Sequence, residues 1–143
     1  MSAKKIVVDT NVIVSALLGS SYPKKIIAGW LSGQIHVVVD EQLRAELNAV
    51  LGRPKVKKAL KSKSSSAVKV VVGALLNLAE WIEPKAIPIR VFTDENDHFL
   101  LELAVGAKAA AIVTGDQEIL KSKKVRGIVV LDPKTFCERF GID

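Results

Sequence analysis

The chain of 143 residues has the length of one ordinary domain, and it is 49% hydrophobic, 25% charged and formally +6 at neutral pH. This composition excludes a disordered or fibrous protein and predicts one globular domain over residues 1–143. The single cysteine, Cys137, excludes an internal disulfide and a zinc site of several thiolates, and two histidines are too few for a histidine-rich metal site.

The first half of the chain alternates strand and helix signals. Short runs of branched apolar residues predict strands, apolar residues spaced three and four apart predict helices, and Gly or Pro marks the ends. The predicted elements are a strand at 6–8, a helix at 12–18, a helix at 24–31 begun by Pro23, a strand at 35–39, a helix at 41–51 capped by Asp40, and a helix at 54–61.

The second half continues the alternation after a serine-rich turn. We expect the last serine of Ser64, Ser65 and Ser66 to cap a long helix. The remaining predicted elements are that helix at about 67–80, a short strand after 81–83, a loop with Pro84 and Pro88, a helix at about 96–107, a strand at 110–113, a short helix at 117–120, a strand at 128–131, and a last helix begun by Pro133.

The strand-like runs, such as Val7-Val8, are apolar without alternation. That pattern is typical of parallel strands covered by helices on both faces, so we predict an α/β fold with a central, doubly wound parallel sheet. Ligands of such sheets bind beyond the carboxyl ends of the strands, where the strand order reverses. Asp9 and Asp116 each follow a predicted strand and should lie there.

No apolar stretch is long enough to span a membrane. The best candidate, residues 67–82, is interrupted by Lys69, Asn77 and Glu80, whereas a span needs about 20 apolar residues. The N-terminus leads straight into a short strand-like run, which is too short for the apolar region of a signal peptide. We therefore expect a cytoplasmic protein without membrane association.

Capping explains some of the aspartates that follow strands. Asp40 and Asp132 each precede an ordinary helix start, where an Asp side chain accepts backbone N–H bonds, and we interpret both as caps. Capping is also an alternative for Asp9 and for Asp116. Thr114, just before Asp116, offers a hydroxyl that could orient a carboxylate or a water.

Two more carboxylates belong to apolar helical stripes. Glu46 shares its stripe with Leu43, Leu47 and Val50, and Asp97 begins a stripe that includes Leu100, Leu101 and Ala104. A carboxylate on a buried stripe is costly unless a cation pairs with it. Capping is the alternative for Asp97, with Asp94 as a rival cap, while Glu102 falls off the stripe and is expected to be solvated.

Together, Asp9, Glu46, Asp97 and Asp116 predict a metal-dependent site that hydrolyses phosphodiesters. Clustered carboxylates repel one another, and a divalent cation is the simplest way to hold several of them ionised. Oxygen ligands favour Mg²⁺ or Mn²⁺, which can activate a water and stabilise charge on phosphorus. The chain has neither a phosphate-binding P-loop motif nor a dinucleotide fingerprint.

Four segments, in this order, resemble the motifs of the PIN-domain nucleases, particularly the small prokaryotic VapC-like toxins. The resemblance covers nearly the whole chain, and each motif is weak alone but the ordered set is specific. The segments are Val7-Val8-Asp9-Thr10-Asn11-Val12, Leu43-Arg44-Ala45-Glu46-Leu47, Asp94-Glu95-Asn96-Asp97 with the helix that follows, and Ile112-Val113-Thr114-Gly115-Asp116. Arg53-Pro54-Lys55 also matches one subgroup.

The resemblance implies a three-layer α/β/α sandwich and a Mg²⁺- or Mn²⁺-dependent endoribonuclease. It also implies frequent homodimers and, often, a cognate antitoxin whose segment covers the acidic groove. Asn96 and His98 stand where many relatives carry further Asp residues, which bears on the number of metal ions. By this resemblance Asp9, Glu46, Asp97 and Asp116 are the catalytic and metal-binding residues, and Asn11 and Thr114 support them through hydrogen bonds.

The lysines form two runs in the sequence. An acidic catalytic groove needs surrounding cations to attract RNA, single-stranded or structured, although both runs are equally consistent with a solvated surface. Few aromatic residues can stack on bases, and Trp30 and Trp81 are as consistent with the core. The candidate nucleic-acid-binding residues are Lys55, Lys57 and Lys58, with Lys61 and Lys63 nearby, and Lys121, Lys123 and Lys124, with Arg126 nearby.

Three other classes of protein are alternatives to the nuclease. Receiver domains and phosphatases also place Asp after parallel strands, but the phosphatase motif wants a second Asp where this chain has Asn11. A receiver needs a lysine after a late strand, where this chain has Asp132-Pro133. The third alternative is a PIN-like module that binds RNA or protein without turnover, and metal-dependent cleavage abolished by Asp9→Asn separates it from the nuclease.

Overall fold

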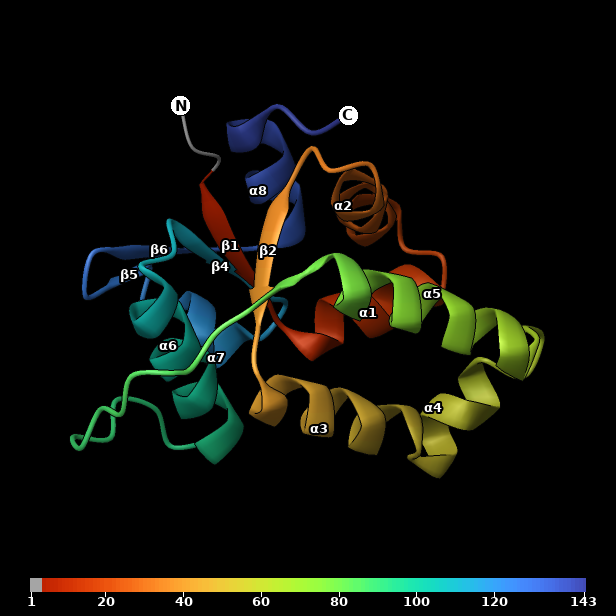
Figure 1. The fold of residues 1–143 in the computed structure, drawn as a ribbon, viewed down its shortest axis with the longest axis horizontal. Coiled ribbons are helices and arrows are strands. Elements are labelled where there is room, and N and C mark those ends of the chain that lie inside the picture. Colours follow the sequence, from red (N-terminus) through yellow and green to blue (C-terminus); the bar gives the residue numbers. More distant parts are fainter. Residues whose placement is uncertain (1–3) are drawn as a thin grey trace.

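The computed structural model describes residues 4–143, and a six-stranded sheet runs through its centre (Figure 1). The sheet order is β3-β2-β1-β4-β6-β5, and all paired strands are parallel except β5, which is antiparallel to β6. This confirms the predicted α/β fold with a doubly wound, mostly parallel sheet. The strands are β1 (Lys5–Val8), β2 (His36–Val39), β3 (Glu80–Trp81), β4 (Ala111–Val113), β5 (Lys124–Val125) and β6 (Ile128–Leu131).

Helices lie on both sides of the sheet (Figure 1). One of them, α6, packs against β1, β2 and β4, whereas α2 packs against α5 and α8. Within residues 4–143, no helix is both long and apolar enough to cross a bilayer. The helices are α1 (Thr10–Leu17), α2 (Ser21–Leu31), α3 (Glu41–Leu51), α4 (Pro54–Ala59), α5 (Ser65–Leu78), α6 (Glu95–Ala107), α7 (Gln117–Leu120) and α8 (Pro133–Phe140).

The central strands are buried on both faces, which explains their unbroken apolar runs. Val7, Val8, Val38, Val39 and Val113 are all fully buried in the core. Burying each such side chain contributes about 1.5–3 kcal/mol. The runs that predicted parallel strands therefore belong to the best buried part of the sheet.

Four details of the element prediction were wrong. Pro23 is the third residue of α2 rather than its first, because Ser20 is the N-cap. The serine that caps α5 is Ser64, not the last of the three, and its hydroxyl accepts a hydrogen bond from the Ala67 N–H at 3.3 Å. The short strand β3 ends at Trp81 instead of following residues 81–83, and β5 was not predicted.

Both short strands depend on pairing rather than on local sequence. In β3, Glu80 and Trp81 align with Val38 and Val39 of β2. The Glu80 carboxylate also accepts hydrogen bonds from Lys5 Nζ at 3.1 Å and from His36 Nε2 at 2.6 Å, which ties this edge to β1 and β2. A two-residue strand is too short to show a period of its own.

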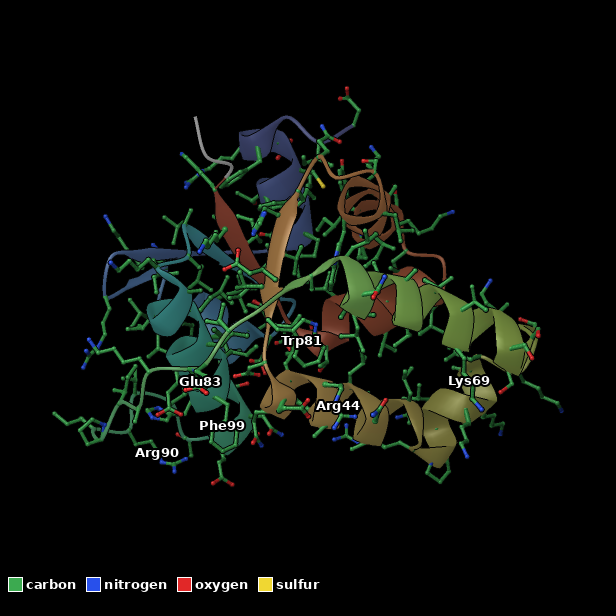
Figure 2. All side chains as sticks on the ribbon, viewed as in Figure 1. Arg44, Lys69, Trp81, Glu83, Arg90 and Phe99 are labelled. Carbon is green, nitrogen blue, oxygen red and sulfur yellow. The ribbon has the colours of Figure 1, made fainter. Side chains whose placement is uncertain are left out.

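A loop of residues 82–94 connects β3 to α6, and it is anchored on that helix. The Ile87 N–H donates to Glu102 Oε2 at 2.7 Å, and the Ile87 carbonyl lies 2.9 Å from His98 Nε2. Glu83 and Arg90 project from this loop (Figure 2). The expectation that Glu102 is solvated was therefore wrong: its side chain is only 16% exposed, because the loop folds over it.

Gly106 allows the same loop to approach α6 closely. A Cβ at this position would lie 2.8 Å from the Glu83 carbonyl oxygen and 2.8 Å from the Lys85 nitrogen. The Lys85 N–H also donates to the Glu102 carbonyl at 3.1 Å. These contacts hold the start of the loop against the last turns of α6.

Candidate active site

The strand order reverses between β1 and β4, and Asp9 follows β1 at that point. Asp9 is 6% exposed and occupies the N-cap position of α1, but its side chain makes no capping hydrogen bond. Its carboxylate instead accepts hydrogen bonds from the Thr114 hydroxyl at 2.8 Å, the Asn11 amide at 3.2 Å and the Thr10 hydroxyl at 3.4 Å. These donors fix the orientation of a carboxylate that the helix does not need.

Thr114 and Asn11 also join the end of β4 to the end of β1. The Thr114 hydroxyl oxygen accepts a hydrogen bond from the Asp116 N–H at 3.0 Å, and Asn11 Oδ1 accepts one from the Gly115 N–H at 3.2 Å. Asp116 caps α7, since its Oδ1 accepts from the Glu118 N–H at 2.8 Å. One oxygen of Asp116 is therefore engaged in capping, and Oδ2 has no hydrogen-bond partner among the described residues.

Glu46 and Asp97 come to the same place from two helices that pack together, α3 and α6. Both side chains are half-buried, and the apolar residues of their helical stripes beside them are buried. Asp97 does not cap α6, because Asp94 is the N-cap and its Oδ1 accepts from the Asn96 and Asp97 N–H groups. The capping alternative for Asp97 was therefore wrong, whereas the predicted caps Asp40 and Asp132 are confirmed.

The four acids line one pocket of about 360 Å³ at the carboxyl ends of β1 and β4. Arg53, at the N-cap of α4, is the cationic side chain that lines it within residues 4–143. Asn96 also lines this pocket, whereas His98 is buried and turned to the Ile87 carbonyl. The carboxylates that face the pocket are Asp9, Glu46, Asp94, Asp97 and Asp116.

Crowding of these carboxylates changes their acidity. Burial, reinforced by the negative charges of Asp9 and Asp94, raises the pKa of Glu46 to about 7 despite the nearby Arg53. Burial, followed by repulsion from Asp116 and the other acids, raises the pKa of Asp97 to about 7 as well. Burial also raises the pKa of Asp9, and the hydrogen bond from Thr114 opposes that shift. The pocket therefore holds groups that can gain or lose a proton near neutrality.

The donor chemistry of this pocket fits a hard divalent cation. Carboxylate oxygens are the ligands that Mg²⁺ and Mn²⁺ prefer, and a cation would relieve the repulsion that adds to burial in raising these pKa values. The side chains are spread around the pocket, however, and among residues 4–143 no three Asp, Glu, His or Cys side chains converge closely enough to hold an ion as they stand. A bound cation would have to draw some of these carboxylates closer together.

The predicted lysines do not line the acidic pocket. Lys57, Lys61 and Lys63 line a separate groove beside α3, whereas Lys55 and Lys58 are exposed elsewhere on α4. In the second run, Lys121 lies 3.4 Å from Glu118, and Lys123 borders a hollow near α8.

Sequence reasoning did not select Arg53 or Asp94 as members of the pocket. Arg53 follows Gly52, just after the stripe that carries Glu46, and continuing that stripe by three residues from Val50 would have pointed to it. Asp94 was predicted as a rival cap and as part of the third motif, but not as a member of the pocket. It both caps α6 and faces the pocket, so one carboxylate contributes to the helix start and to the crowded charge.

A family model described as the PIN domain matches residues 5–118, a range that contains all four acids. The protein MJ1680 of Methanocaldococcus jannaschii, described as uncharacterized, is 28% identical over 145 residues, which cover 95% of this chain and 91% of that protein. The match of the family model to most of the chain is the finding that assigns a family.

Two solved structures share the fold. PAE2754 from Pyrobaculum aerophilum gives a TM-score of 0.64 at 18% identity, over 98% of this chain and 91% of that one. VapBC2 from Rickettsia felis, solved bound to a DNA fragment from their promoter, gives a TM-score of 0.58 at 16% identity, over 90% of this chain and 98% of that one. At these identities the similarity concerns the arrangement of helices and strands.

Proposed function

Because this chain belongs to the PIN-domain family, we propose that it is a metal-dependent endoribonuclease, the toxin component of a toxin–antitoxin pair. Residues 1–143 would form a single nuclease domain. Its substrate would be RNA, single-stranded or structured, and its reaction the hydrolysis of phosphodiester bonds. Asp9, Glu46, Asp97 and Asp116 would be the catalytic and metal-binding residues.

One observation carries the proposal: four acids from separate segments face one pocket at the switch point of the sheet, and two of them have a pKa of about 7. Folding does not require this arrangement. Asp9 is buried without capping α1, and Glu46 stands on a stripe where an apolar side chain would stabilise the fold more. An unfavourable cluster of this kind is typical of functional sites.

Each group would have a distinct role. Asp9, held by Asn11 and Thr114, would provide a fixed ligand oxygen, and Asp116 would provide the oxygen that its cap leaves free. Mg²⁺ or Mn²⁺ bound among the acids would supply the positive charge that stabilises the phosphate as it reacts. With part of the repulsion offset by the cation, Glu46 and Asp97 would be ionised at neutral pH, so either could accept a proton from the attacking water.

The partners follow from the same assignment. An antitoxin segment that covers the acidic pocket would need to present cations to its five carboxylates, as Arg53 already does from one side. Lys121, Lys123 and Lys124 would attract RNA toward the α7 side of the pocket. We also propose that the protein forms a homodimer. Sedimentation at micromolar concentration that shows only monomer would contradict the homodimer.

A second candidate function is a PIN-like module that binds RNA or protein without turnover. The observation in its favour is that no three ligand side chains converge within the described residues. This candidate predicts RNA binding that chelators leave unchanged and no product under any metal condition.

The experiment that tests the proposal is cleavage of a mixed set of labelled RNAs and single-stranded DNAs in Mn²⁺, in Mg²⁺ and in chelator. Wild type is compared with Asp116→Asn, and with Glu118→Gln as a matched control. Glu118 is two residues away and exposed, and it does not line the pocket. The proposal expects products from wild type and Glu118→Gln only with metal, and none from Asp116→Asn.

Two results would oppose the nuclease. Equal inertness of folded wild type and Asp116→Asn, with RNA still bound, favours the non-catalytic module. Products that form equally with Asp116→Asn indicate a contaminating nuclease or a different site. Products from single-stranded DNA alone would keep the hydrolytic site but replace the substrate class.

A further inference from the structure

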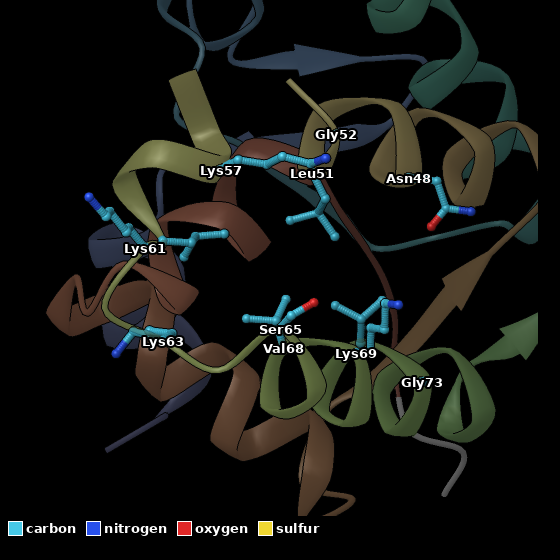
Figure 3. A pocket seen from close by; sticks show the side chains of 12 residues that line it. Asn48, Leu51, Gly52, Lys57, Lys61, Lys63, Ser65, Val68, Lys69 and Gly73 are labelled. Carbon is cyan, nitrogen blue, oxygen red and sulfur yellow. The ribbon is translucent and has the colours of Figure 1, made fainter. Parts of the chain in front are cut away.

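A second hollow, larger than the acidic pocket, lies on the other side of α3. It is a groove of about 750 Å³ between α3 and α4 on one wall and the first turns of α5 on the other (Figure 3). Four lysines border it: Lys57 and Lys61 from α4, Lys63 from the turn that follows, and Lys69 from α5. Nothing in the proposed chemistry uses this groove.

The charge of this groove is of one sign. All four lysines are exposed, and no Asp or Glu lines the groove within residues 4–143. None of the four forms a salt bridge with a carboxylate of the described chain. Figure 3 shows Lys57 and Lys69 on facing walls, with Lys61 and Lys63 together at one end. Ammonium groups that are not neutralised by the protein favour an anionic ligand with several charges.

The floor of the groove is apolar, and the charge lies on its rim. The floor is formed by Leu51, Leu60, Val68 and Val72, and two of these, Leu60 and Val72, are less than 10% exposed. The charged side chains that line the groove are all lysines, so its charge is wholly positive. This charge favours a polyanion whose phosphates contact the lysine rim while its uncharged parts lie over the apolar floor.

The groove and the acidic pocket are neighbours across the end of α3. Glu46, Val50 and Arg53 line the pocket, while Asn48, Leu51 and Gly52 line the groove. Arg53 and Gly52 are adjacent in sequence, so the turn from α3 to α4 forms the ridge between the two hollows. A chain of phosphates that left the pocket past Arg53 and crossed this ridge would enter the groove that Lys57 borders.

We propose that this groove binds the phosphates of the RNA segment that flanks the cleaved bond. The inference rests on the proposed function, because it assigns the adjoining path of the same substrate. Lys57, Lys61, Lys63 and Lys69 contact phosphates without reading bases, since lysine contacts to the backbone carry no sequence information. RNA that is too short to cross the ridge does not use the groove.

The test measures binding of labelled single-stranded RNA in EDTA, where cleavage does not contribute. Lys61, Lys63 and Lys69 are changed to Gln together, and a control protein carries Lys24→Gln, Lys85→Gln and Lys134→Gln, which remove the same charge from exposed positions outside the groove. Figure 2 shows Lys69 at the α4–α5 end of the molecule. Circular dichroism checks that both triple variants are folded.

We expect the groove variant to bind RNA of about 12 nucleotides about tenfold more weakly than the control protein. The slope of log affinity against log salt falls by about 2, since each lost phosphate contact contributes about 0.7 on a single strand. Affinity for RNA of about 4 nucleotides stays the same in both.

Several outcomes would overturn the inference. Equal weakening in both triple variants means that only net charge matters. Unchanged binding in the groove variant removes the groove from the RNA path, and an acidic amphipathic peptide that binds the groove while RNA does not would assign it to a protein partner. If wild type cleaves nothing yet the groove variant loses RNA affinity, the proposed nuclease function is wrong, and the assignment of the groove to RNA phosphates is retained.

Discussion

The two faces of α3 border two very different hollows. On one face, acids from four separate segments are buried or half-buried, and burial together with mutual repulsion raises the pKa of Asp9, Glu46 and Asp97. On the other, lysines from one short stretch, residues 57–69, stand exposed around a floor of core side chains. A crowded, interdependent cluster should fail as a unit, whereas a row of exposed charges should weaken by increments.

The largest expected effect is that of Asp9→Asn. It removes the charge of a carboxylate that Thr114, Asn11 and Thr10 hold in place, while the shape of the side chain is kept. We expect the rate of RNA cleavage in Mn²⁺ to fall by about a thousandfold, which corresponds to roughly 4 kcal/mol of lost stabilisation. Single-turnover kinetics check this. A loss of less than threefold would mean that the acidic pocket does not act as a unit.

Cation binding should depend steeply on pH between 6 and 8. Protons compete with the cation for Glu46 and Asp97, whose pKa values are about 7 in the free protein. Below pH 7, each unit of increase in pH should raise the affinity for Mn²⁺ by up to about tenfold for each carboxylate that must lose its proton on binding. Calorimetric titration at several pH values measures it. Asp97→Asn should flatten the dependence, and an unchanged slope in that variant would contradict the assignment.

The same two groups should make the chelated protein less stable as pH rises. Their pKa values are higher in the folded protein than the ordinary 4.5 and 3.8, so the folded state holds more protons between about pH 4 and pH 7. Their contribution to the free energy of unfolding is therefore fully present below pH 4 and lost as pH rises through 7. At pH 8, Asp97→Asn should raise Tm by about 2–4 °C. Thermal melts in EDTA test the sign, and a lower Tm would refute it.

Breaking the anchor of the 82–94 loop should lower stability at a distance from the pocket. Glu102→Ala leaves the Ile87 N–H without its acceptor, at a cost of roughly 1–3 kcal/mol in unfolding free energy. Glu102→Gln keeps an acceptor oxygen and is the matched control. Denaturant unfolding compares them, with cleavage as a second readout. Equal stability of the two variants would show that this hydrogen bond does not hold the loop.

The sequence revealed the parts of this molecule whose signals are local. The strands β1, β2 and β4 are buried on both faces, so their sequences are unbroken apolar runs. The helical period placed Glu46 on the same stripe as the buried Leu43 and Leu47. Resemblance to the PIN-domain motifs predicted that Thr114 supports the acids through hydrogen bonds, and its hydroxyl donates to Asp9. Fold class and the four acids of the pocket were therefore within reach.

Features that depend on long-range packing could not be predicted from the sequence. Glu102 looked solvated because its helical stripe is exposed until the loop closes over it, and that loop carries no periodic signal. The short strand β3 exists through its pairing with β2. The sequence grouped Lys55, Lys57 and Lys58. Of these three, only Lys57 lines the groove, which Lys69 lines from another helix.

The most direct test of the central claim is a Mn²⁺ titration of wild type at pH 8, compared with Asp9→Asn, Glu46→Gln, Asp97→Asn and Asp116→Asn in turn. Glu118→Gln again serves as the control. If the four acids form one cation site, each of the four variants weakens Mn²⁺ binding by about tenfold or more, and the control binds as wild type does. If wild type binds no Mn²⁺, or if the four variants bind it as well as wild type does, the pocket is not the metal site of a nuclease.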